Sequence, residues 1–172
     1  AHEKGLLQPI TSDVVSGSIP AYLRAEDDSW VGLTKRARVI VYHPDRVDTS
    51  KLSTYEALVD PEWKGRILIR SSGNIYNQSL LASIVAYAGE DAAKTWAEGM
   101  VTNFARRPKG NDRDQVKAIL AGEGDLAVIN TYYLGLLRNA TDEQSAKAGN
   151  AVKIFFPNQD GRGTHVNVSG IG

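Results

Sequence analysis

The sequence of 172 residues contains no cysteine, so neither a disulfide nor a thiolate metal site can form. It has no excess of either charge, because 20 lysines and arginines balance 20 aspartates and glutamates. The basic surplus that drives binding to nucleic acids or anionic membranes is therefore missing. No apolar run approaches the length of a membrane span. The length itself is sufficient for one domain with a substantial core.

Familiar catalytic and cofactor motifs are also missing. The chain has no Ser/His/Asp set, no glycine-rich phosphate loop and no His-x-Glu metal motif. His165 lies in an alternating, strand-like pattern, which favours a structural role over metal ligation. We therefore predict that the protein is not an enzyme. An enzyme that uses Tyr133 as an acid or base is the alternative from a different functional class.

Short apolar runs alternate with amphipathic segments along most of the chain. The patterns predict strands at 38–42, 66–70, 126–129, 151–156 and 165–168. They predict helices at 53–59, 78–88, 90–101 and 131–139, and another that begins at Asn111 or Asp112 and ends before Gly122. Strands that alternate with helices indicate an α/β fold, with helices on both faces of the sheet.

Three tyrosines follow two of the predicted strands. Tyr132 and Tyr133 come after the strand at 126–129, where a helix begins, and Tyr76 lies in the loop after 66–70. The N-terminus of a helix carries unpaired N–H groups and partial positive charge, which favour anions such as a metal-bound phenolate. Ligands of α/β sheets bind beyond the carboxyl ends of the strands, so both loops point to one site. The alternative is that the aromatic pair only packs against the helix start.

Several motifs resemble the bacterial periplasmic ferric-iron-binding proteins, which are the solute-binding subunits of iron ABC importers. These motifs are WVGLTKRARVIVY at 30–42, WKGRI at 63–67, NTYY at 130–133, FPNQ at 156–159 and GTHVNVSG at 163–170. The loop SGNIY at 72–76 is similar to the branch that binds iron without a required anion, the cyanobacterial iron-deficiency-induced type. The resemblance extends along essentially the whole chain.

The resemblance implies a two-lobed fold of the type II periplasmic binding protein class, with crossing hinge strands. Part of the first lobe and the hinge entry would occupy residues 1–37. The second α/β lobe, with the tyrosines, would occupy 38–152, and the hinge return would occupy 153–172. The first-lobe ligands of the family have no counterpart here, so we expect a partial chain. We also expect a monomer in the periplasm, although no signal peptide is present.

The resemblance also implies that Tyr76, Tyr132 and Tyr133 bind Fe(III) as phenolates and that an ABC transporter permease receives it. Hard cations select oxygen donors. Because a free phenol has a pKa of about 10, iron must displace a proton from each tyrosine. The competing function within the same class is the binding of another small solute, such as a phosphonate, a polyamine, a sugar or thiamine.

Five further residues are predicted around the metal. Arg36 would balance phenolate charge or hold an anion, and a solvated arginine is an equal alternative. Four residues match positions that hold an anion in the anion-dependent relatives, namely Ser72, Gly73, Asn111 and Asn130. Tyr76 would replace that anion here, so their role could be limited to hydrogen bonding. For Asn111, a plain helix cap is the favoured interpretation.

Overall fold

The computed structural model describes residues 1–172 and divides them into two compact units. One unit comprises 1–36 with 166–172, and the other comprises 37–165. The larger unit continues as far as His165, and the hinge return that the resemblance implies at 153–172 stays a prediction. That the two units correspond to the lobes of a clamp stays a prediction. None of the helices is long and apolar enough to cross a membrane.

The smaller unit is built around a pair of strands. It contains the first part of β1 (Val31–Tyr42), which pairs with β5 (Val166–Ile171). Three short helices precede β1: the 3₁₀ helices His2–Lys4 and Ala21–Leu23, and α1 (Asp13–Ser18) between them. The Ser12 hydroxyl caps α1 by accepting a hydrogen bond from the Val15 N–H.

The larger unit contains a mixed sheet with the strand order β2-β3-β1-β4. Its other strands are β2 (Ile67–Leu68), β3 (Leu126–Asn130) and β4 (Lys153–Phe155). β1 is antiparallel to β3 and to β4, whereas β2 and β3 are parallel. The register pairs Arg38 with Asn130 and Tyr42 with Leu126. The strand predicted at 66–70 therefore shrinks to two residues in β2.

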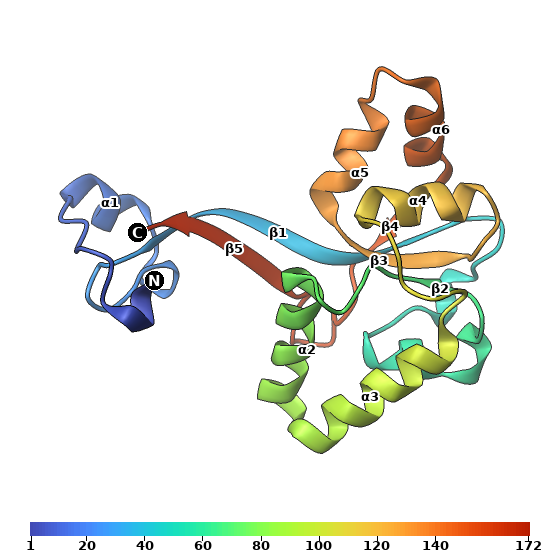
Figure 1. Ribbon diagram of the computed structural model, residues 1–172, viewed down its shortest axis with the longest axis horizontal. Helices are drawn as coiled ribbons and strands as arrows, with labels where there is room; N and C mark the ends of the chain where they lie inside the picture. The colour runs from blue at the N-terminus through green and yellow to red at the C-terminus, as the bar shows by residue number, and fades with distance from the viewer. The chain divides into compact units, whose positions relative to one another are not determined.

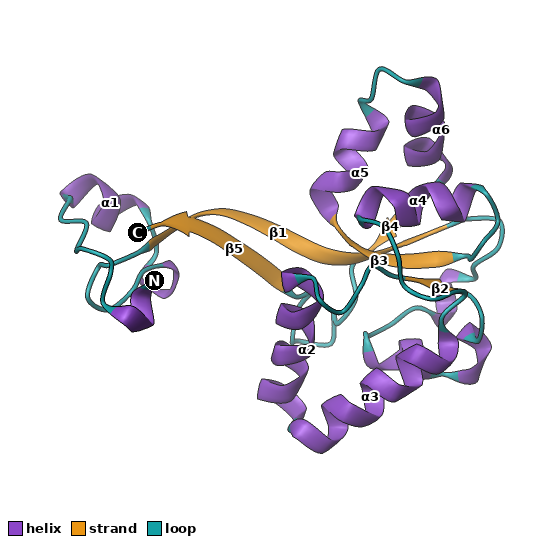
Figure 2. Ribbon diagram, in the orientation of Figure 1, coloured by secondary structure: helices purple, strands orange, loops and turns teal.

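Five α-helices surround this sheet (Figure 2), and they are α2 (Ile75–Ala88), α3 (Glu90–Asn103), α4 (Asp112–Leu120), α5 (Thr131–Arg138) and α6 (Glu143–Ala151). Three short 3₁₀ helices, Thr49–Lys51, Glu56–Val59 and Pro61–Trp63, complete the unit. The helix predicted at 53–59 is found as the shorter 3₁₀ helix Glu56–Val59, which begins three residues later. The helix predicted at 78–88 begins earlier, at Ile75.

The strands bury both faces, as their alternating side chains require. Ile40 and Val128 point into one core, where they meet Leu80 of α2 and Met100 of α3. The neighbouring strand residues point into a second core formed with α4, α5 and α6, which contains Val39, Ile129, Val116, Leu134 and Ala148. The helices therefore cover both faces of the sheet, as predicted, with α2 and α3 on one side and α4 to α6 on the other (Figure 1).

Tyr55 ties the centre of the larger unit together and is only 2% exposed. Its hydroxyl donates a hydrogen bond to the Arg38 carbonyl oxygen and accepts one from the His165 N–H at 3.2 Å. Its carbonyl accepts from the Trp96 indole at 2.8 Å. Burial of the phenol raises the pKa of Tyr55 well above its ordinary value.

Replacing Tyr55 with phenylalanine removes the hydroxyl that pairs with the buried Arg38 carbonyl oxygen and with the part-buried His165 N–H. We expect Tyr55→Phe to lower the free energy of unfolding by about 1–3 kcal/mol at pH 7, measured by denaturant titration. Because the folded pKa is raised, the unfolded phenol ionises first. Wild-type stability therefore falls as the pH rises above 10 towards the folded pKa, and the variant should lose less over that range.

The matched control is Tyr87→Phe, because Tyr87 is 66% exposed and its phenyl ring still faces Arg162. The free energy of unfolding of that variant should match that of the wild type at pH 7 and above pH 10. Equal stability of Tyr55→Phe and the wild type at pH 7 would show that the two hydrogen bonds contribute nothing.

Candidate metal centre

The tyrosine pair occupies the first turn of α5, directly after β3. Asn130 is the last residue of β3 and the N-cap residue of α5, yet its side chain makes no cap hydrogen bond. The N–H groups of this first turn therefore have no side-chain cap, and the turn keeps its partial positive charge. Tyr132 is 38% exposed, whereas the Tyr133 ring packs against the core that α5 helps to form.

The third tyrosine occupies the first turn of another helix. Tyr76 is the second residue of α2, and its N–H donates to the Asn74 side chain at 3.1 Å. Because α2 begins earlier than the sequence pattern indicated, Tyr76 is held by a helix and not by a loop. The side chain of Tyr76 is half-buried.

The structure brings the three tyrosines together. The rings of Tyr132 and Tyr133 have centroids 4.1 Å apart and are tilted by 31°. Desolvation raises the pKa of Tyr132, and hydrogen bonding to the side chains of Tyr133 and Tyr76 raises it further. Three phenols from two helix starts thus share one cluster, and Tyr132 stays protonated at neutral pH unless a cation displaces the proton. Tyr133 both packs its ring against the core and contacts Tyr132, so the packing role and membership of the cluster are compatible.

Asn130 lies beside this cluster and is fully buried. Its N–H donates to Asp112 Oδ2 at 2.9 Å, and its side-chain oxygen accepts from Arg38 Nη1 at 3.5 Å. The side-chain nitrogen has no hydrogen-bond partner in the protein. A buried N–H donor without a partner costs free energy, and a small anion or water would remove that cost.

The other predicted residues have contacts of their own. Asn111 caps α4 in a reciprocal capping box: its side chain accepts from the Asp114 N–H, and the Asp114 side chain accepts from the Asn111 N–H at 2.7 Å. The Gly73 N–H donates to the Ser71 hydroxyl at 3.2 Å. Arg36 belongs to the smaller unit, where it donates to the Thr34 and Ser169 hydroxyls.

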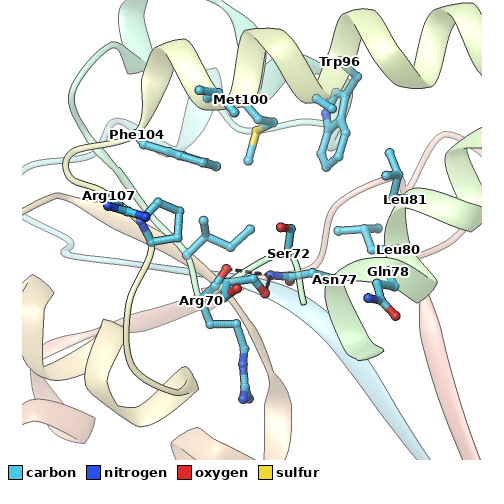
Figure 3. A pocket seen from close by; sticks show the side chains of 15 residues that line it. Arg70, Ser72, Asn77, Gln78, Leu80, Leu81, Trp96, Met100, Phe104 and Arg107 are labelled. Atoms are coloured by element: carbon cyan, nitrogen blue, oxygen red, sulfur yellow. Dashed lines mark hydrogen bonds between the residues drawn. The ribbon is translucent and has the colours of Figure 1, made fainter. Parts of the chain in front are cut away.

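Ser72 lines a pocket of about 440 Å³ between α2 and α3. Figure 3 shows Trp96, Met100 and Phe104 on one side of this pocket, opposite Ser72 and Leu80. No tyrosine lines it. The pocket is therefore distinct from the tyrosine cluster, although Asn77 lines the pocket and directly follows Tyr76 in the chain.

Sequence reasoning missed the ion pair beneath the cluster. Arg38 and Asp112 are both fully buried, and Arg38 Nη1 donates to Asp112 Oδ2 at 2.6 Å. Burial lowers the pKa of Arg38, and the Asp112 carboxylate opposes that shift. The available signal was a charged residue, Arg38, at the start of the apolar strand predicted at 38–42.

No group of three histidine, aspartate or glutamate side chains is placed to hold a metal ion. His165 Nε2 lies 3.0 Å from the Ser79 hydroxyl, and the main-chain groups of His165 pair with Arg38 and Tyr55. A metal site in this chain would therefore depend on phenol oxygens, which a hard cation prefers once they are ionised.

This mixed sheet with two helical layers and an oxygen-rich cluster at the strand ends is the architecture of a solute-binding protein. Residues 1–164 match the family of bacterial extracellular solute-binding proteins, and the chain belongs to that family. The predicted type II periplasmic binding protein fold is confirmed, because solved ferric-binding proteins of that fold superpose on 98% of the chain.

Several similar proteins are named for iron uptake or iron binding. The chain is 53% identical over 172 residues to iron uptake protein A1 of Synechocystis, matching 100% of this chain and 48% of the relative. The ferric binding protein of Campylobacter jejuni superposes with a TM-score of 0.94 at 48% identity, covering 98% of this chain and 54% of that one. The Trichodesmium protein IdiA (FutA), solved with iron and citrate, gives 0.93 at 51% identity over the same shares. The chain spans about half the length of these relatives.

The capping role of Asn111 leads to a direct test. Asn111→Ala removes the side-chain acceptor of the capping box and should lower the free energy of unfolding by about 1 kcal/mol. Serine is an equivalent cap, so Asn111→Ser should restore most of that loss. Thermal unfolding of the three proteins provides the comparison, and an alanine variant as stable as the wild type would contradict the capping role.

Proposed function

We propose that the protein binds Fe(III) through the phenolates of Tyr76, Tyr132 and Tyr133. The observation that carries this proposal is the shared hydroxyl cluster at the starts of α2 and α5. The relatives that bear names for iron uptake and ferric binding match the chain over its whole length or nearly so. Together they favour a ferric ion as the solute over a phosphonate, a polyamine, a sugar or thiamine.

The donor set suits a small trivalent cation. Three phenolates supply three negative charges, which neutralise Fe(III) without any carboxylate ligand. The raised pKa of Tyr132 opposes ionisation in the free protein, so the charge of the metal must drive the loss of the proton. The two helix N-termini behind the tyrosines favour the resulting phenolates further.

Other groups would fill the remaining coordination positions. Water, a small anion or residues of a longer chain are the available sources. The unpartnered side-chain nitrogen of Asn130 is a donor for a bound anion. The roles predicted for Arg36, Ser72, Gly73 and Asn111 around the metal stay predictions.

The proposal extends to the place and the partner of the whole protein. A member of an extracellular solute-binding family would hold its cargo in the periplasm and deliver it to an ABC transporter permease. We propose that it works there as a monomer that binds and releases iron without turnover. An enzyme based on Tyr133 has no support from the relatives, which are named for iron uptake and iron binding.

Ferric citrate titration followed by visible absorption tests the ligand set. The wild type should develop a phenolate-to-iron charge-transfer band. Tyr132→Phe and Tyr133→Phe should each weaken iron binding by at least ~100-fold, because loss of a ligand should exceed the ~10- to 100-fold effect of losing a group that only orients one. Tyr87→Phe, at an exposed position outside the cluster, should bind like the wild type. Wild-type affinity in the Tyr132→Phe/Tyr133→Phe double variant would refute the proposal.

The number of ligating phenols sets the pH dependence of binding. Each tyrosine releases a proton when it ligates iron, so affinity falls as the pH falls. With three such ligands, pH-stat titration at neutral pH should record about three protons released per iron, after correction for the citrate blank. Tyr76→Phe should lower the count by about one. An unchanged count would remove Tyr76 from the ligand set.

A further inference from the structure

One buried carboxylate connects several elements at the edge of the tyrosine cluster. Asp112, the first residue of α4, accepts from Arg38 Nη1 at 2.6 Å and from the Asn130 N–H at 2.9 Å, both through Oδ2. Its other oxygen lies 3.4 Å from Arg70 Nη1. Because Asn130 immediately precedes α5, Asp112 fixes the point at which the helix of Tyr132 and Tyr133 begins.

The arginine of the pair extends the connection to the other tyrosine helix. Arg38 Nη2 donates to the side-chain oxygen of Asn77, the residue that follows Tyr76 in α2. The Asn77 amide in turn donates to the carbonyl oxygens of Arg70 at 2.8 Å and Ser71 at 3.2 Å. One planar guanidinium therefore contacts both the Asp112 carboxylate and the first turn of α2.

Apolar packing does not make the same connection. Leu80 of α2 belongs to the core on one face of the sheet, and Leu134 of α5 belongs to the core on the other face. The two helices thus dock on separate cores, so apolar packing alone does not set the distance between their first turns. The spacing between these turns decides whether the hydroxyl of Tyr76 reaches that of Tyr132.

We propose that the buried Arg38–Asp112 pair is a positioning device, which holds the starts of α2 and α5 at the separation that lets three phenol oxygens reach one metal ion. This inference rests on the proposed ferric function and deepens it. Neither residue touches the metal, because Arg38 acts through Asn77 and Asp112 acts through Asn130. A buried ion pair is weak evidence for stability on its own, and fixed geometry is the better-supported reason to keep one.

Two substitutions separate position from charge. Asp112→Asn keeps the size of the side chain but removes the charge that pairs with Arg38. Arg38→Lys keeps the charge but lacks the planar fork that contacts two partners at once. Each should bind iron ~10- to 100-fold more weakly, the usual loss when a group that orients a ligand is changed. Each should also have a weakened or shifted charge-transfer band at saturating iron.

Asp125 offers a matched control in the same unit. It too is held between two arginines, with Arg46 Nε and Arg66 Nε each 2.7 Å from one of its oxygens, but it precedes β3 and lies at the strand end opposite Asn130. Asp125→Asn should reduce the melting temperature and leave the band and the iron affinity unchanged. Both substitutions remove a carboxylate charge that lies between two arginines. An effect on iron binding that comes only from lower stability should therefore appear in both variants.

The outcomes distinguish the two proposals. If Asp112→Asn and Arg38→Lys keep the wild-type band and affinity, positioning is wrong while ferric binding stands. If Asp125→Asn weakens iron binding as much as Asp112→Asn does, the effect is general and positioning is again wrong. A colourless wild type overturns ferric binding itself, and the positioning proposal with it. Should Asp112→Asn fail to fold, Arg38→Lys, which retains the charge, decides the question.

Discussion

A buried arginine constrains the arrangement of the larger unit. Arg38 lies in β1 with no exposed surface, and an unpaired ion in that position would cost several kcal/mol. Asp112 offsets this cost, and it can do so only if α4 begins near the end of β3, where Arg38 pairs with Asn130. The second guanidinium nitrogen donates to Asn77, which places the start of α2 at the same end of the sheet. With α5 continuing directly from β3, three helices begin within reach of one buried charge.

This convergence explains how one site both resists and favours ionised tyrosines. The phenols stabilise one another as neutral hydrogen-bonding groups, and desolvation keeps Tyr132 protonated. The helix N-termini around them carry partial positive charge, which stabilises phenolates once they form. A monovalent or weakly attracted cation gains too little to displace the protons, whereas a trivalent one gains the most. Under the proposed function, selectivity for a highly charged metal follows from this balance.

The sequence pattern predicted those strands and helices whose ends are marked by apolar runs and turn residues. The apolar run before Asn130 predicted β3, and the two tyrosine-bearing segments were placed after strands because apolar runs and turn residues mark those boundaries. Helix α6 was missed because Glu143–Ala151 is rich in alanine, glycine and polar residues and lacks a clear apolar stripe. The strand at 66–70 was overestimated because the sequence cannot tell how many residues find a pairing partner. The buried role of Asp112 could not be predicted because Asp112 and Asp114 both belong to the first turn of α4, and only the fold determines that Asp112 faces inward.

All the proposed ligands belong to one of the two units, and this indicates what the rest of a longer chain would add. All three tyrosines, their helices and the Arg38–Asp112 pair belong to residues 37–165, which also enclose two cores of their own. Three phenolates already neutralise a ferric ion, so this unit contains the donors that would determine which ion is bound. Ligands from elsewhere would chiefly exclude water from the remaining coordination positions and slow the release of the metal. Under the proposed function, the tyrosine-bearing unit would therefore determine which metal is bound, and ligands from a longer chain would determine how long the ion is retained.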